Sequence, residues 1–247
     1  DIVLQEQGIL VKIGFQPANV DRTAEFVVVT GAHGGMSNPE AKEALKFGLP
    51  TLMLGKYRGS LMEDKCGISI AGCHGKTTTS AIIASLLTNS GLKPSYAVGT
   101  AQINDLGYAG HFGQGKYFVA EADEYMTCPI TDRTPRFLWQ KPKLLVITNI
   151  DYDHPDAFKD IEEIKKAFIQ FANNLADESN IVICQDDRNA VSIIPYLKNK
   201  VITYGFSPKS DYRIEKIYFG DGLSSMRFLF KNTDLGDCRR GRRRDTA

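Results

Sequence analysis

The 247-residue sequence has few cysteines, almost no net charge and no long hydrophobic run. Its five cysteines are scattered without a Cys-x-x-Cys pair, which is typical of reduced thiols and argues against a disulfide framework or a zinc site. The net charge of +1 gives no bulk attraction to nucleic acid. No apolar stretch approaches the length of a membrane span, and the N-terminus lacks the charged and apolar regions of a signal peptide. We therefore expect a cytoplasmic protein without nucleic-acid or membrane partners.

A hydrophobic content of 43% is enough for one or two domains with buried cores. Apolar runs alternate with helical patterns, which predicts an α/β fold with a mostly parallel, doubly wound sheet. We expect a partial Rossmann-like domain at residues 1–62 and a P-loop central domain at residues 63–231. Residues 232–247 contain five arginines and are predicted to be a disordered polar tail. Because Asp1 is not an initiator methionine, we expect the chain to begin part-way into a longer protein.

The N-terminal domain has three strand-like segments, at residues 9–13, 26–30 and 50–54. A helix is expected to begin at Pro39, because Asn38 before it is a favourable capping residue. The loop at residues 30–37 follows a strand, at the edge where open α/β sheets bind ligands. His33 in this loop could contact a ligand or be an exposed loop residue, and the second interpretation is favoured. Residues 57–65 are expected to link this domain to the next.

The segment at residues 67–79 has the pattern of a phosphate-binding loop. A short apolar strand precedes the loop at residues 72–77, and apolar residues at helical spacing follow it. The glycines let backbone N–H groups point at oxygens, and the helix N-terminus adds about half a positive charge. Lys76 would reach the outer phosphates, and the Thr77 hydroxyl would ligate Mg²⁺. The spacing Gly-x-x-Gly-Lys-Thr is shorter than the common Gly-x4-Gly-Lys-[Ser/Thr] form.

Later strands end in groups that could complete such a site. Glu121 follows the predicted strand at residues 117–120, and His154 follows the one at residues 143–150. The carboxyl ends of parallel strands share one edge, so both side chains are expected to converge on the phosphate loop. A carboxylate and an imidazole beside a triphosphate suit Mg²⁺ that bridges phosphate oxygens. Four further carboxylates, which the sequence does not rank, could support this site: Asp123, Glu124, Asp151 and Asp153.

Three motifs contain these residues: Gly72-Cys-His-Gly-Lys-Thr-Thr78, Glu121-Ala-Asp-Glu124 and Thr148-Asn-Ile-Asp-Tyr-Asp-His154. Together they resemble the signatures of the Mur ligases, ATP-dependent enzymes of bacterial wall synthesis that attach amino acids or peptides to UDP-N-acetylmuramic acid. Residues 37–40 and 201–207 add a likeness to the members that join L-alanine to UDP-N-acetylmuramate. The resemblance extends over residues 8–230.

The resemblance implies roles for individual residues. The ATP phosphates would be bound by Gly72, Cys73, His74, Gly75, Lys76, Thr77 and Thr78. Thr77 and Glu121 would hold one Mg²⁺ and His154 a second, while Asn149 would line the nucleotide site. Lys76, Glu121 and His154 would be the catalytic residues. The implied reaction converts the lactyl carboxylate of the muramic acid to an acyl phosphate, which an amine converts to an amide.

Three features depart from the family pattern. Cys73 stands where the family usually has threonine, so one hydroxyl of the loop is missing. Residues 125–141 are longer than expected for an L-alanine ligase and resemble members that attach a murein tripeptide in wall recycling, which leaves the acceptor open. The Gly-x-His-Asn motif of the family's last domain has no counterpart, so the chain could also be a non-catalytic nucleotide-binding fragment. A GTPase would need an Asn-Lys-x-Asp motif, which residues 149–151 do not supply.

Overall fold

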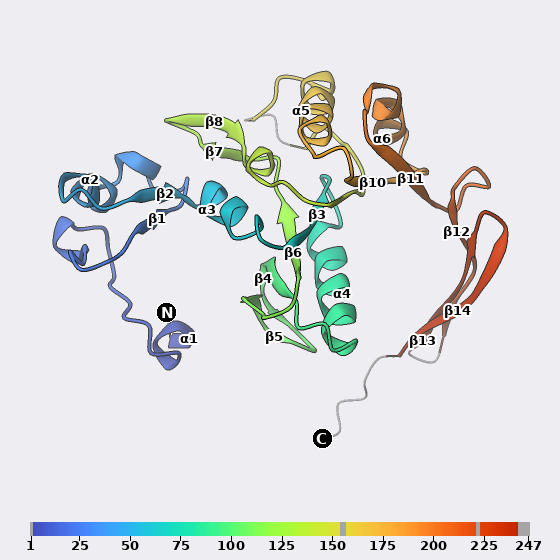
Figure 1. The fold of residues 1–247 in the computed structure, drawn as a ribbon, viewed down its shortest axis with the longest axis horizontal. Helices are drawn as coiled ribbons and strands as arrows, with labels where there is room; N and C mark the ends of the chain where they lie inside the picture. Colours follow the sequence, from blue (N-terminus) through green and yellow to red (C-terminus); the bar gives the residue numbers. More distant parts are fainter. Residues whose placement is uncertain (1, 154–156, 221–222, 242–247) are drawn as a thin grey trace.

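The computed structural model describes residues 2–153, 157–220 and 223–241 (Figure 1). The chain runs from an N-terminal unit at one end, through a central sheet, to a ribbon of long strands at the other end. His154, one of the predicted site residues, lies outside the described residues. None of the described helices is both long and apolar enough to cross a membrane.

The N-terminal unit is built around a small parallel sheet of two strands, in which Val27 is paired with Thr51. Its elements are α1 (Ile2–Glu6), η1 (Pro17–Asn19), β1 (Val27–Val29), η2 (Gly35–Ser37), α2 (Pro39–Lys46), β2 (Thr51–Met53) and α3 (Leu54–Ser60). Helix α2 begins as predicted, because the Asn38 side chain accepts a hydrogen bond from the Glu40 N–H at 2.9 Å.

One expectation for this unit is wrong. Residues 9–13 form no strand: β1 and β2 pair only with each other within the described residues, so this segment has no partner strand there. Residues 57–65, expected to link this unit to the next, lie between β2 and β3 of the next domain, and helix α3 extends into them. Gly55 and Gly59 weaken the helical pattern of the sequence. The packing requires a small residue at Gly59, because a Cβ there would overlap the carbonyl oxygen of Trp139.

The central domain contains a ten-stranded sheet in the order β14-β13-β12-β11-β10-β9-β3-β6-β4-β5. All neighbouring strands from β12 to β4 in this order are parallel, which confirms the predicted mostly parallel sheet. The strands are β3 (Cys66–Ala71), β4 (Ser95–Ile103), β5 (Gly107–His111), β6 (Tyr117–Ala122), β9 (Leu144–Ile147), β10 (Asn180–Cys184), β11 (Lys200–Gly205), β12 (Tyr212–Gly220), β13 (Leu223–Phe230) and β14 (Thr233–Gly241).

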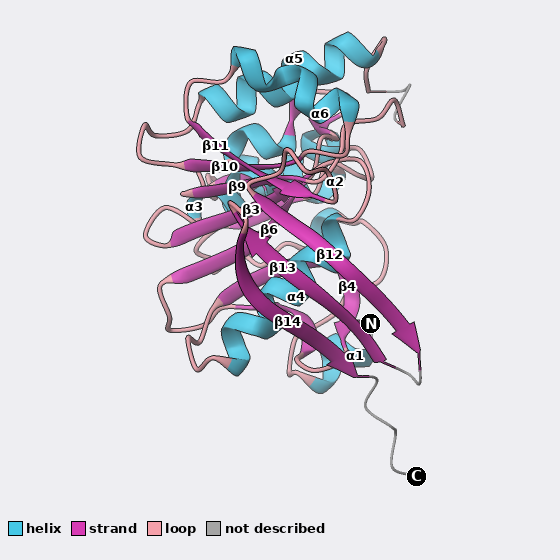
Figure 2. Ribbon diagram, turned by 90° about the vertical axis from the view of Figure 1, so that its right-hand side faces the viewer, coloured by secondary structure: helices cyan, strands magenta, loops and turns pink. Residues whose placement is uncertain are grey.

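Helices cover both faces of this sheet (Figure 2). They are α4 (Lys76–Asn89), α5 (Ile161–Asn173) and α6 (Arg188–Ile193), followed by the short turn η4 (Ile194–Tyr196). Strand β9 shows why both faces need cover. Leu145 and Ile147 pack in the core beneath α5 and α6, whereas Val146 between them packs in the core beneath α4. Because alternate residues of a strand point to opposite faces, an uninterrupted apolar run is buried on both sides, as the doubly wound prediction requires.

The end of the chain differs from the prediction. Residues 233–241 form strand β14, which pairs antiparallel with β13, so the disordered tail expected from residue 232 onward is wrong for these residues. The polar composition did not reveal that β13 offers an edge with free backbone groups for pairing. Residues 242–247 lie outside the described residues.

The segment at residues 125–141 connects the central domain to the N-terminal unit. It contains the hairpin β7 (Met126–Cys128) and β8 (Asp132–Pro135) and the turn η3 (Arg136–Trp139). The Trp139 indole N–H donates to the Thr127 hydroxyl at 2.8 Å, and Lys56 from α3 lies 4.3 Å from the Trp139 ring centroid. Gly31 at the carboxyl end of β1 lies so close to the Thr127 backbone that a Cβ would overlap it. The hairpin therefore joins the carboxyl ends of β1 and β6.

Candidate functional site

The phosphate-binding loop predicted from the sequence lies between β3 and α4. Gly72 and Gly75 have φ angles of 132° and 81°, a region that favours glycine, and a Cβ on Gly72 would overlap the Thr148 hydroxyl. These two glycines let the chain turn sharply from the buried strand into the helix.

Helix α4 begins without a side-chain cap. Its N-cap residue is Gly75, whereas Asn38, Asp160 and Asp187 cap α2, α5 and α6 with their side-chain oxygens. The first N–H groups of a helix have no acceptor within the helix, and the helix dipole makes this end positive. The 14-residue helix α4 therefore directs uncapped N–H groups toward the loop, where a phosphate could accept them.

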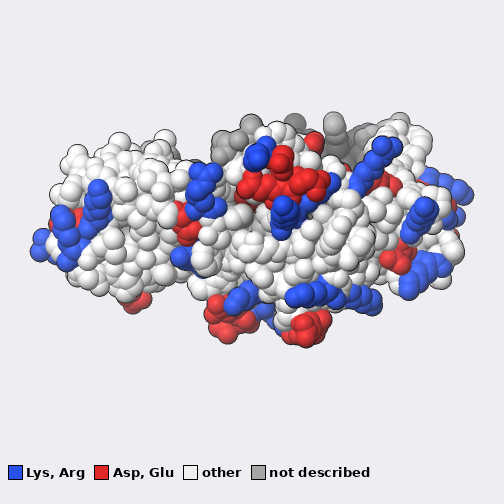
Figure 3. All heavy atoms as spheres, turned by 90° about the horizontal axis from the view of Figure 1, so that it is seen from above, with Lys and Arg blue, Asp and Glu red and all other residues white. Residues whose placement is uncertain are grey.

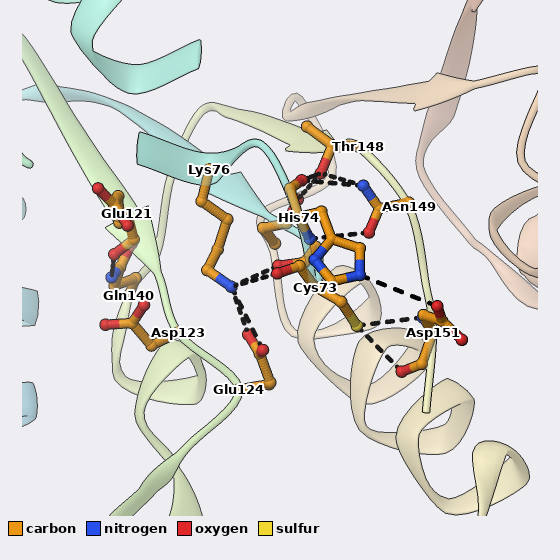
Figure 4. Close-up of polar contacts among 12 residues, drawn as sticks. Cys73, His74, Lys76, Glu121, Asp123, Glu124, Gln140, Thr148, Asn149 and Asp151 are labelled. Carbon is orange, nitrogen blue, oxygen red and sulfur yellow. Dashed lines mark hydrogen bonds and ion pairs between the residues drawn. The ribbon is translucent and has the colours of Figure 1, made fainter. Parts of the chain in front are cut away.

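Residues after β9 hold the loop in shape (Figure 4). The Asn149 amide bonds to both backbone groups of His74: its Oδ1 accepts from the His74 N–H at 2.9 Å, and its Nδ2 donates to the His74 carbonyl at 2.9 Å. The Thr148 hydroxyl donates to the same carbonyl at 2.7 Å. Asn149, expected to line the nucleotide site, thus supports the loop, and its contact with a nucleotide stays a prediction. Thr148 begins the third motif, but the motif alone does not indicate that its hydroxyl supports the loop.

Cys73 makes a further connection to this segment. Its Sγ donates to the Asp151 carbonyl at 3.0 Å and accepts from the Asp151 N–H at 3.1 Å. Burial is the main factor that raises the pKa of the Cys73 thiol to about 11, so the thiol stays protonated near neutral pH. A neutral thiol with two backbone hydrogen bonds supports the loop and is a poor nucleophile.

Lys76 is folded back over the loop. Its Nζ donates to the Gly72 carbonyl at 2.5 Å and lies 3.1 Å and 3.2 Å from the two carboxylate oxygens of Glu124. Glu124 is buried and Lys76 is mostly shielded from solvent, with 1% and 11% of their side chains exposed. Of the four supporting carboxylates considered from the sequence, Glu124 is therefore the one that contacts the loop lysine (Figure 4).

Glu121 lies at the end of β6, and its carboxylate is held by the neighbouring strand β4. Its Oε1 accepts from the Gly99 N–H at 2.5 Å, and a Cβ on Gly99 would lie 3.1 Å from both carboxylate oxygens. The side chain is buried, 5% exposed, and has no ion-pair partner among the described residues. A buried carboxylate without a counter-ion fits a site for a cation, and Mg²⁺ prefers oxygen ligands.

A buried polar chain supports Glu121 from behind. The Gln140 Nε2 donates to the Glu121 carbonyl at 2.8 Å, and the Ser69 hydroxyl donates to the Gln140 Oε1 at 2.5 Å. Sequence reasoning missed Gly99, Gln140 and Ser69, because glycine, glutamine and serine carry no spacing signal of their own. Only the arrangement of β3, β4 and β6 brings them to the site.

The remaining predicted residues are only partly brought together. Thr77 and Thr78 lie in the first turn of α4, next to Lys76. His74 is exposed, with its Nε2 3.9 Å from Asp151 Oδ2. Among the described residues, no three side chains of His, Cys, Asp or Glu form a ready metal cluster. The proposed metal set of Thr77, Glu121 and His154 therefore cannot be assembled within the described part of the chain, because His154 is not in it.

The chain is similar to known ligases in sequence. The family model described as the Mur ligase middle domain matches residues 70–238. A UDP-N-acetylmuramate–L-alanine ligase from Carboxydothermus hydrogenoformans is 40% identical over 236 residues, which cover 96% of this chain and 49% of that protein. The chain thus spans about half the length of this relative.

Two solved structures share the fold. A UDP-N-acetylmuramate:L-alanyl-gamma-D-glutamyl-meso-diaminopimelate ligase from Neisseria meningitides matches with a TM-score of 0.81 and 23% identity, over 96% of this chain and 74% of that one. A UDP-N-acetylmuramate-alanine ligase from Thermotoga maritima matches with a TM-score of 0.76 and 21% identity, over 96% and 51%. The glycine loop, the Glu121 motif and the segment after β9 all lie in the part that the family model matches. The chain belongs to the Mur ligase family.

Proposed function

We propose that this chain carries the ATP-binding part of a cytoplasmic ligase that joins L-alanine to the lactyl carboxylate of UDP-N-acetylmuramate in peptidoglycan synthesis. The observation that supports this proposal best is that the N-terminus of α4 has no side-chain cap and lies beside Lys76. Free N–H groups and a lysine ammonium together favour the binding of a phosphate. The 40% identity to an L-alanine ligase supports the choice of amino acid.

In the proposed reaction, the lactyl carboxylate attacks the γ-phosphate of ATP and ADP leaves, which gives an acyl phosphate. The amine of L-alanine then attacks the acyl carbon, and phosphate leaves as the amide forms. Lys76 and the first N–H groups of α4 would stabilise the negative charge that develops on the transferred phosphoryl group. No covalent enzyme nucleophile is required, which agrees with the high pKa, about 11, of the Cys73 thiol.

The residues fit a magnesium ion at the phosphates. Thr77 would supply a hydroxyl from the first turn of α4, and Glu121 a carboxylate that Gly99 already orients. His154 is proposed for a second ion. When bound, Mg²⁺ would neutralise phosphate charge and orient the γ-phosphate.

On the face seen from above, Lys and Arg are spread along the molecule and form no single basic patch (Figure 3). This face and the net charge of +1 agree with partners other than nucleic acid.

The proposed ligase activity is tested by measuring phosphate release in the presence of ATP, UDP-N-acetylmuramate and L-alanine, with the amide product identified by mass spectrometry. The family's third domain would position the amine, and positioning of two reactants is worth roughly 7–11 kcal/mol of barrier. We expect the 247-residue chain to bind Mg·ATP weakly and form little amide, and a protein extended through a third domain to ligate L-alanine. Tripeptide preference in the extended protein would shift the assignment to murein peptide ligase. Robust ligation by the 247-residue chain would refute the need for a third domain.

A further inference from the structure

We propose that Glu124 is the counter-ion of Lys76 in the empty site and that the phosphates of ATP replace it as the partner of the Lys76 ammonium. The inference rests on the proposed function and assigns a positioning role to a residue that the sequence could not rank. The ion pair would stabilise the Lys76 charge in the phosphate site before the nucleotide binds.

The donors of the Lys76 ammonium are all directed at acceptors of the protein. A lysine ammonium has three N–H donors. Around Lys76 Nζ lie the Gly72 carbonyl at 2.5 Å, the Cys73 carbonyl at 3.4 Å and the Glu124 carboxylate at 3.1 Å. All three acceptors belong to the protein, so a phosphate oxygen can bond to this ammonium only by replacing one of them.

Of these acceptors, the Glu124 carboxylate is the one that a bound phosphate would displace. The carbonyls of Gly72 and Cys73 belong to the loop itself and carry only partial charge. Glu124 approaches from the segment after β6 and carries a full negative charge (Figure 4). A triphosphate in the loop would repel this carboxylate while attracting Lys76, so the contact between Lys76 and Glu124 is the one that the nucleotide weakens.

The ion pair between Lys76 and Glu124 is shielded from solvent. Only 11% of the Lys76 side chain and 1% of the Glu124 side chain are exposed. Among the described residues, Glu124 is the carboxylate within ion-pair distance of Lys76, so the Lys76 ammonium, which water reaches poorly, depends on Glu124 for charge compensation in the empty site. The pair should stabilise the empty protein and at the same time oppose ATP binding. A residue with a purely structural role would affect both quantities in the same direction.

The experiment compares Glu124→Gln with the wild-type chain in two measurements, urea unfolding and calorimetric titration with Mg·ATP. Glutamine preserves the shape and removes the charge. We expect the unfolding equilibrium constant to rise on the order of 100-fold, because Lys76 is left buried without a counter-ion. We expect the Kd for Mg·ATP to fall roughly threefold to tenfold, because a nearby negative charge is gone.

The matched control is Glu178→Gln. Glu178 also pairs with a lysine, Lys143, but both side chains are largely exposed, at 66% and 46%. Surface pairs of this kind contribute little to stability. The control should change neither the unfolding equilibrium nor the Kd beyond about twofold. It removes the same carboxylate charge and the same type of ion pair at a distance from the loop.

A double variant keeps the test decisive if Glu124→Gln does not fold. In the Lys76→Met background no buried ammonium remains, so adding Glu124→Gln should restore folding or leave stability unchanged. A double variant that is as unstable as Glu124→Gln alone would refute the pairing.

Three other results would overturn the inference. An unchanged or weakened affinity of Glu124→Gln for Mg·ATP would show that Glu124 does not compete with the nucleotide. A loss of affinity specific to Mg·ATP, and absent with metal-free ATP, would make Glu124 a metal ligand instead. If the wild-type chain binds no nucleotide at all, the proposed function falls and the inference with it. Binding by the wild type with no change in the variant removes the inference alone.

Discussion

Replacement of Asn149 tests whether the loop is held by the segment after β9. In the structure both ends of the Asn149 amide bond to the backbone of His74, each at 2.9 Å. In Asn149→Ala both hydrogen bonds are lost. In Asn149→Asp the acceptor for the His74 N–H remains, but a charged oxygen replaces the donor that faced the His74 carbonyl.

The magnitude follows from these two contacts. A hydrogen bond of this kind contributes about 0.5–1.5 kcal/mol, so Asn149→Ala should lose about 1–3 kcal/mol of loop stability. The lower half of this range is expected, because His74 is exposed and water can replace part of what is lost. Asn149→Asp should cost more than Asn149→Ala, since two oxygens would face each other at the former hydrogen-bond distance.

The assay measures the Kd for Mg·ATP and the urea midpoint of the three proteins. A loss of about 1.5 kcal/mol of loop order corresponds to roughly a tenfold weaker Kd. If Asn149 instead touched only the nucleotide, the urea midpoint would stay unchanged in both variants. Equal effects of the alanine and aspartate variants would contradict the two-ended bonding that we describe.

Three further predictions concern other parts of the site. Glu121→Gln should raise the Mg²⁺ concentration needed for half-maximal activity of the extended protein, and so should His154→Ala; an unchanged Mg²⁺ requirement would exclude both as ligands. The pKa of the Cys73 thiol is raised from 9.0 to about 11, so the stability linked to it is present below pH 9.0 and lost as the pH rises through about 11; urea midpoints should fall more steeply over this window in the wild type than in Cys73→Thr. Gly59→Ala should lower the free energy of unfolding, measured by urea titration, by about 1–3 kcal/mol, because its Cβ overlaps the Trp139 carbonyl, whereas Gly110→Ala, where a Cβ meets nothing within 4 Å, should not.

The sheet could be predicted where the sequence repeats a strong pattern. Residues 144–147 form an apolar run that is buried on both faces, and Asn38 before Pro39 is a local cap signal that needs no tertiary information. The segment at residues 9–13 has the same apolar character, yet it forms no strand, because strand formation depends on a partner that the local sequence does not specify.

The site could be predicted to the level of its motifs but not of its contacts. The motif spacing identified the loop around Lys76 and the carboxylate at Glu121. It could not show that Glu124, rather than Glu121, contacts Lys76, since this depends on how the chain turns after β6. Nor could it find Gly99, whose N–H reaches Glu121 from a strand 22 residues away in the chain.

The central claim is that the loop after β3 binds the phosphates of ATP through Lys76. Calorimetric titration of the 247-residue chain and of Lys76→Ala with Mg·ATP tests it most directly. A charge-assisted contact of this kind contributes roughly 1.5–3 kcal/mol, so the variant should bind about 10-fold to 150-fold more weakly than the wild type while retaining a folded circular dichroism spectrum. Equal affinity in the two proteins would contradict the assignment of this loop as the phosphate site.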